Sequence, residues 1–209
     1  MAPLPFLAIS ALGAVALTAL AAPAFAAQPG ATPDWPCVQR LVPELAPAQM
    51  WTGKPLDQLP PGATLAPPLQ DLPARLADRD LPLDEAKRLV DQALAQVPEA
   101  QREDQRALLF RDTLARINDQ RGQVIAGIES FARGQRQLAD RITAEGRQLV
   151  QLRKDPAQAA ALQDTTNARS WDMRVFDERQ HSLRTLCDQP AQLDHRAFEL
   201  ARIIQGQTQ

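Results

Sequence analysis

Histidine, cysteine and tyrosine are scarce in this sequence, which has two histidines, two cysteines and no tyrosine. A metal centre needs several convergent ligands, so this scarcity argues against one. The two cysteines do not form a C-x-x-C pair, and no G-x-S-x-G motif provides a nucleophile elbow. We therefore expect no catalytic residue, no bound metal and no cofactor.

One grouping has the residue types of a catalytic triad, namely Asp177, His181 and Ser182. Asp177 and His181 are four residues apart, which on a helix makes an ordinary side-chain pair, and Ser182 points about 100° away from His181. A copper site made of Met173, His181 and Cys187 would spread its ligands over about 20 Å of helix. We interpret both groupings as helix surface.

Charge of one sign is not in excess either, since 23 basic and 25 acidic residues give a net charge of −2. The two signs are interleaved along the sequence. A nucleic-acid surface would need clustered Lys and Arg side chains. We therefore expect no nucleic-acid partner.

The first 26 residues contain no charged side chain. An apolar run from Phe6 to Leu20 is followed by Ala-Phe-Ala at residues 24–26, a small-x-small pattern typical of cleavage after an export signal. The run is shorter than the roughly 20 apolar residues that span a bilayer, which disfavours the alternative of an uncut anchor. We predict a signal peptide over residues 1–26 and a periplasmic or secreted protein with no stable membrane anchor after cleavage.

Proline is concentrated early in the predicted mature chain, where 12 of the 18 prolines lie between residues 29 and 82. Each proline removes a backbone donor and holds its predecessor extended, which excludes long helices and central strands. A disordered linker is the alternative, but it would normally lack large apolar residues such as Trp35 and Trp51. We predict a proline-rich extended arm over residues 27–81 that runs along a helical body, with its weakest anchors at residues 57–73.

The following segment has the periodicity of helices. Apolar residues recur at helical spacing from Leu83 up to Pro98. A much longer seam then alternates steps of four and three residues, which is the 3.5-residue period of a coiled coil. Its positions are Phe110, Leu114, Ile117, Arg121, Val124, Ile128, Phe131, Gln135, Leu138, Ile142, Glu145, Leu149 and Leu152.

The turn signal Lys154-Asp155-Pro156 requires the next helix to run back antiparallel to this seam. Facing residues should then have numbers that add up to about 311, from equal rise along both helices. On this register Met173 belongs to the return seam and faces Leu138. Pro190 is expected to break or kink the chain before a last short helix.

These patterns predict an all-α fold over residues 82–209: a long, coiled-coil-like antiparallel helical hairpin that is thickened into a small bundle. Cys37 in the arm and Cys187 on the return helix are expected to form a disulfide, because an exported chain meets an oxidising compartment. A free or intermolecular pair and a reactive thiol are the alternatives.

The residues Trp35, Arg40, Met50 and Trp51 form a candidate protein-binding surface, because Trp and Arg are the commonest hot-spot residues of interfaces. Their alternative role is structural, with the Trp side chains covering a helical groove near the disulfide.

The absence of site chemistry favours an exported, non-enzymatic protein-binding or adaptor protein that acts through its helical hairpin and Trp-bearing arm. Its partner would be an unidentified protein or a second copy of the chain. The first alternative function is a self-assembling structural coiled coil. The second is a small-ligand-binding protein or an enzyme accessory subunit.

Overall fold

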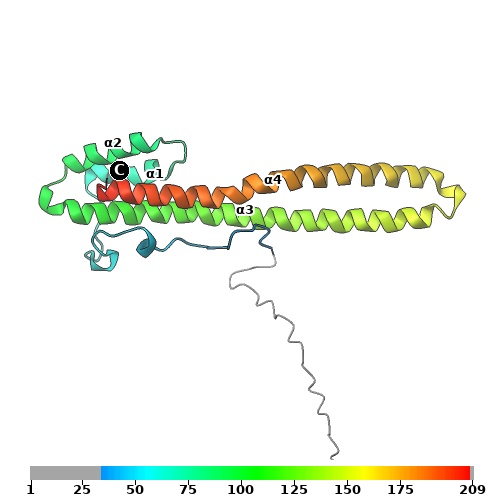
Figure 1. Cartoon of the computed structure of the whole chain (residues 1–209), viewed down its shortest axis with the longest axis horizontal. Coiled ribbons are helices and arrows are strands. Elements are labelled where there is room, and N and C mark those ends of the chain that lie inside the picture. Colours follow the sequence, from blue (N-terminus) through cyan, green and yellow to red (C-terminus); the bar gives the residue numbers. More distant parts are fainter. Residues whose placement is uncertain (1–33, 208–209) are drawn as a thin grey trace, which may run out of the picture.

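The computed structural model describes residues 34–207, so the predicted signal peptide lies outside the described residues. Two long helices dominate the fold, α3 (Arg102–Leu152) and α4 (Ala159–Gln205). They pack against each other as an antiparallel hairpin (Figure 1). The described residues include no strand. The predicted all-α hairpin is therefore confirmed.

The predicted seam of α3 is confirmed along its whole length. All thirteen seam positions from Phe110 to Leu152 are buried or half-buried. The helix begins with Glu103 and Asp104 in its first turn, where carboxylates are favoured by the helix dipole. The helix also continues without interruption through its four glycines. Burial of the apolar stripe against α4 therefore outweighs the weak helix propensity of glycine.

The register of the hairpin agrees with the prediction. The Gln135 side-chain amide donates to the Phe176 carbonyl at 3.2 Å, and both residue numbers add up to 311. The numbers of Arg169 and Ile142 also add up to 311, and the Arg169 Nε donates to the Ile142 carbonyl at 3.4 Å. These two cross-hairpin bonds fix α4 against α3 over about two turns.

The predicted place of Met173 in the seam of α4 is wrong. Met173 is 41% exposed, and its neighbour Asp172 occupies the buried position. Thr165, about two turns further toward the tip, is half-buried while Thr166 is exposed. Asp172 takes the inward position because Arg141 of α3 pairs with its carboxylate across the hairpin.

The two long helices are thickened into a bundle at the end away from the 156–158 turn (Figure 1). Here α1 (Leu72–Ala77) and α2 (Leu83–Ala95) pack against α3 and α4. The large, fully buried side chains of this core are Leu69, Leu76, Val90, Val97, Leu108, Leu109, Phe110, Ile117, Leu193, Leu200 and Ile204.

Of the two predicted effects of Pro190, the break before a separate last helix is wrong, because α4 continues through this residue to Gln205, whereas a kink is not contradicted. Proline removes one helical hydrogen bond and crowds the preceding turn, a local cost. Pro190 is itself buried, as are Cys187 and Leu193 on either side of it. Packing of this face therefore keeps the two halves of α4 in one helix.

The described part of the arm runs alongside α3 from its middle toward the bundle (Figure 1). It contains three 3-10 turns, at Pro47–Gln49, Leu56–Gln58 and Pro67–Leu69, and leads into α1. Leu65 and Leu69 are buried in the core. The expectation of weak anchors over residues 57–73 is therefore wrong.

Candidate functional site

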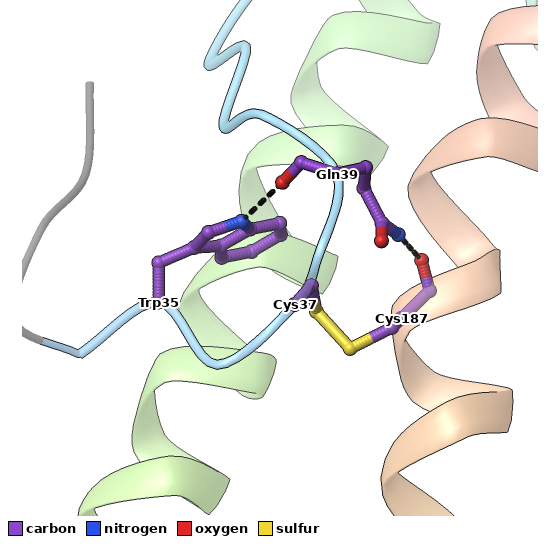
Figure 2. Close-up of a disulfide and its surroundings, with 4 residues drawn as sticks. All are labelled: Trp35, Cys37, Gln39 and Cys187. Carbon is purple, nitrogen blue, oxygen red and sulfur yellow. Dashed lines mark hydrogen bonds between the residues drawn. A yellow bond between two sulfur atoms is a disulfide. The ribbon is translucent and has the colours of Figure 1, made fainter. Parts of the chain in front are cut away.

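The disulfide between Cys37 and Cys187 is present, with an S–S distance of 2.02 Å, and it joins residues 150 positions apart. It ties the beginning of the described arm to α4 (Figure 2). Cys37 is half-buried and Cys187 is buried. The predicted pairing is confirmed, and neither cysteine is a free thiol.

The loop around Cys37 is closed by two hydrogen bonds (Figure 2). The Trp35 indole N–H donates to the Gln39 carbonyl at 2.8 Å. The Gln39 side-chain amide donates to the carbonyl of Cys187. This carbonyl is next to that of Leu186, which has no helical donor because Pro190 lacks an N–H. The arm thus covers the one turn of α4 that proline weakens.

Asp34, three residues before Cys37, anchors the arm to α3. Its carboxylate forms ion pairs with Arg133, at 2.9 Å, and with Arg136, both on α3. The hydrogen bond from Arg133 is the main reason that the pKa of Asp34 is lowered, and the positive charge of Arg136 adds to it. The pairs are exposed, so water and salt screen them.

Arg121 joins the arm, α3 and α4 at a buried point. Its guanidinium is 2% exposed, and Nη2 donates to the Val42 carbonyl at 2.7 Å. Nη1 lies 3.0 Å from Oδ1 of Asp194, an ion pair without hydrogen-bond geometry. Burial lowers the pKa of Arg121 and raises that of Asp194, and the charge of each partner opposes the other's shift.

Side-chain amides hold the middle of the arm by its backbone. Asn118 accepts from the Leu45 N–H at 2.9 Å and donates to the Leu45 carbonyl at 3.1 Å. Gln105 accepts from the Ala66 N–H at 2.7 Å. Proline leaves this segment unable to pair as a regular strand, so these amides satisfy groups that would otherwise need water. We call these contacts, with that of Gln205 below, the amide latches.

The Met50-Trp51 segment of the arm packs into the bundle. Trp51 stacks on Phe110, with ring centroids 4.4 Å apart and planes 8° from parallel. Met50 is only 8% exposed. The Gln205 side chain accepts from the Thr52 N–H at 2.9 Å and donates to the Met50 carbonyl at 3.2 Å. Both large side chains therefore have a structural partner.

The structure does not gather the four candidate binding residues into one surface. Trp35 and Arg40 line a cavity of about 100 Å³ beside Ile125 of α3. Trp51 lies on Phe110, which is about 22 Å away along the same helix. Of the four candidates, only Arg40 is exposed.

A different surface emerges on the distal hairpin, which we define as residues 138–178. There α3 and α4 continue as a pair beyond the bundle (Figure 1). Trp171 is 62% exposed, and the Arg174 guanidinium lies 5.4 Å from the centre of its ring. Between Trp171 and Met173, the Asp172 carboxylate turns inward and takes two hydrogen bonds from Arg141.

Sequence reasoning missed this surface because it placed Met173 in the seam. The sequence signal for this surface was Asp172, an acidic residue between the large apolar residues Trp171 and Met173. Successive residues on a helix point about 100° apart, so burying Asp172 turns Trp171 and Met173 to opposite flanks of α4.

The triad-like residues are helix surface, as expected. The His181 ring Nδ1 lies 2.7 Å from the Asp177 backbone carbonyl rather than from its carboxylate. The Ser182 hydroxyl donates to the carbonyl of Glu178 at 3.2 Å. Over residues 34–207, no group of three His, Cys, Asp or Glu side chains could hold a metal ion.

No helix in the described part of the chain is long and apolar enough to cross a membrane. Comparison with protein-family models, curated proteins and solved structures finds no match to this chain. Its function is therefore argued from its own residues and geometry.

Proposed function

We propose that this protein is an exported, non-enzymatic adaptor that binds another protein through its distal hairpin. The observation that carries the proposal is Trp171, a large aromatic residue that is 62% exposed on a helix. Tryptophan and arginine are the residue types most enriched at interface hot spots, and Arg174 lies beside the ring.

The distal hairpin is well suited to present such a residue. Its register is set by the Gln135–Phe176 hydrogen bond and the Arg141–Asp172 pair, so the Trp171 backbone is fixed. A Trp side chain has only two side-chain torsions, so it loses little conformational entropy when it binds. The Trp-bearing arm supports binding less well, because Met50 is buried and Trp51 is stacked on Phe110.

Export is supported by the charge-free apolar segment at residues 1–26 and by the disulfide between two distant cysteines. Non-enzymatic action is supported by the surface positions of the triad-like residues, whose polar atoms bond to their own helix.

A photo-crosslinking amino acid at position 171 tests the proposal in living cells. We expect one discrete adduct with a second protein. Gln163 provides a matched control, because it is exposed on the same helix about two turns away. The proposal fails if position 171 gives no adduct, or if positions 171 and 163 give the same diffuse pattern.

Self-assembly is the second candidate, because the same exposed flanks, Trp171 and Met173, could be covered by a second hairpin. In that case the adduct from position 171 contains two copies of this chain. Sedimentation equilibrium of the purified protein separates the candidates, since a strict monomer contradicts self-assembly.

A further inference from the structure

The disulfide opens onto a groove that the adaptor function does not use. Arm residues 36–39 form one wall of this groove, which has a volume of about 500 Å³. The other wall is formed by α4, from Gln180 to Asp188. Both cysteines line it, and Val38 beside Cys37 is fully exposed. A disulfide in an accessible position can be attacked without unfolding of the protein.

We propose that Cys37–Cys187 is an exchangeable disulfide, which an external dithiol attacks through this groove and whose reduction releases arm residues 34–40. The proposal does not depend on the adaptor function. The partner it implies is a dithiol reductant, a small molecule or a protein with two neighbouring thiols.

The chemistry is thiol–disulfide exchange. A thiolate of the dithiol attacks Sγ of Cys37, the more exposed cysteine, and forms a mixed disulfide while the Cys187 thiolate leaves. The second thiolate of the reductant then attacks its own sulfur in the mixed disulfide and displaces the Cys37 thiolate. The dithiol is oxidised to a disulfide, Cys37–Cys187 is reduced by two electrons, and each released thiolate takes up a proton at neutral pH.

Reduction should release only the beginning of the arm. Without the disulfide, residues 34–40 are held by the exposed Asp34 ion pairs and the Gln39 contact. The next residues are held independently, because the Leu41 side chain is buried and Arg121 donates to the Val42 carbonyl. The opening therefore stops at Leu41.

Reduction kinetics of the oxidised full chain test this, with dithiothreitol as the probe and alkylation with mass spectrometry to count thiols. Attack on the native state predicts a rate proportional to dithiothreitol concentration in the absence of denaturant. A rate that saturates at the independently measured rate of global unfolding would overturn the proposal.

Two Trp substitutions locate the attack. Gln180→Trp narrows the groove and should slow reduction by at least about threefold, whereas Gln148→Trp, at an exposed position on α3 outside the groove, should leave the rate unchanged. Equal rates for the two variants would overturn the assignment of the groove.

Limited trypsin digestion of the reduced protein tests the release. Cleavage after Arg40 should be at least about tenfold faster than in the oxidised protein, and cleavage within the bundle should stay slow. Unchanged cleavage after Arg40, or rapid cleavage in the bundle, would contradict a local release.

Discussion

The Arg121 guanidinium is buried in the seam of the hairpin. The inward-facing residues on either side of it along α3 are Ile117 and Ile125. Only Nη2 has a hydrogen bond, to the arm, and Nε and Nη1 have none within the protein. A buried charge is costly unless it is paired, and Asp194 supplies the pairing charge. We infer that this residue specifies where the arm docks more than it adds stability.

Replacing this guanidinium should destabilise the protein. Arg121→Met leaves the Val42 carbonyl and the Asp194 carboxylate without their partner, and we expect the free energy of unfolding to fall by about 2 kcal/mol. Urea unfolding of the oxidised protein measures it. Arg116→Met, at an exposed position on the same helix, is the control and should change little. Equal losses in the two variants would contradict a special role for Arg121.

At the scale of elements, the sequence correctly predicts the features that follow from the residue pattern of a single helix or turn. The α3 seam follows from apolar spacing alone, and so do the turn at residues 154–156 and the register of the hairpin. The disulfide follows from the predicted compartment and the number of cysteines. In each case a strong local pattern agrees with the packing.

The wrong predictions concern positions whose structure is determined by contacts with another element. Met173 loses its seam position to Asp172 because Arg141, on the opposite helix, satisfies the inward carboxylate. Pro190 stays inside α4 because both of its flanks are buried against the rest of the protein. The amide latches could not be predicted, since Gln and Asn at surface spacing look the same whether they meet water or an arm.

A double-mutant cycle tests the contact between the arm and the proline turn. Gln39→Ala should cost about 1 kcal/mol, because the Cys187 carbonyl loses its donor. Pro190→Ala provides an N–H for the Leu186 carbonyl and not for that of Cys187, so the same substitution should cost about as much in this background. Thermal unfolding of the four proteins gives the coupling. A cost that disappears in the Pro190→Ala background would contradict an independent bond from Gln39 to the Cys187 carbonyl.

The hairpin turn should depend on pH through Asp155. Its carboxylate accepts from the Ala157 N–H at 3.0 Å and from the Gln158 amide at 2.9 Å, and the Gln158 bond is the main reason its pKa is below 3.8. Because the folded-state pKa is lowered, this stabilisation is complete above the ordinary value and lost as pH falls through the lowered one.

Asp155→Ala should therefore lower the melting temperature at pH 6, and this difference should shrink as the pH is taken below 3.8. Scanning calorimetry of both proteins over this range measures it. A difference that grows on acidification would contradict the assigned hydrogen bonds.

At the scale of the whole molecule, one end is a bundle built from the four α-helices of residues 34–207 and the docked arm, and the other is a bare pair of helices. The disulfide and the Asp34 ion pairs attach the arm near the middle of α3, between the two ends. The protein is therefore divided into a stable bundle and an exposed distal hairpin.

Removing the disulfide should lower the free energy of unfolding without changing the fold. Closing a loop of this length stabilises a chain by up to about 5 kcal/mol in the entropy model, and engineered cases usually give less. We expect Cys37→Ser with Cys187→Ser to lower the free energy of unfolding by about 2–4 kcal/mol in urea. Unchanged helical circular dichroism would show that the fold persists, and collapse of the signal would contradict independent anchoring by the amide latches.

The central structural claim is that the amide latches dock a proline-rich arm along a helical hairpin. Residue-resolved hydrogen exchange of the oxidised protein tests it most directly, because three arm amides each have one assigned acceptor: those of Leu45, Thr52 and Ala66. We predict that all three exchange at least about a hundredfold more slowly than in an unfolded chain. Exchange of these three amides at the unfolded rate, with the bundle still protected, would contradict the docked arm.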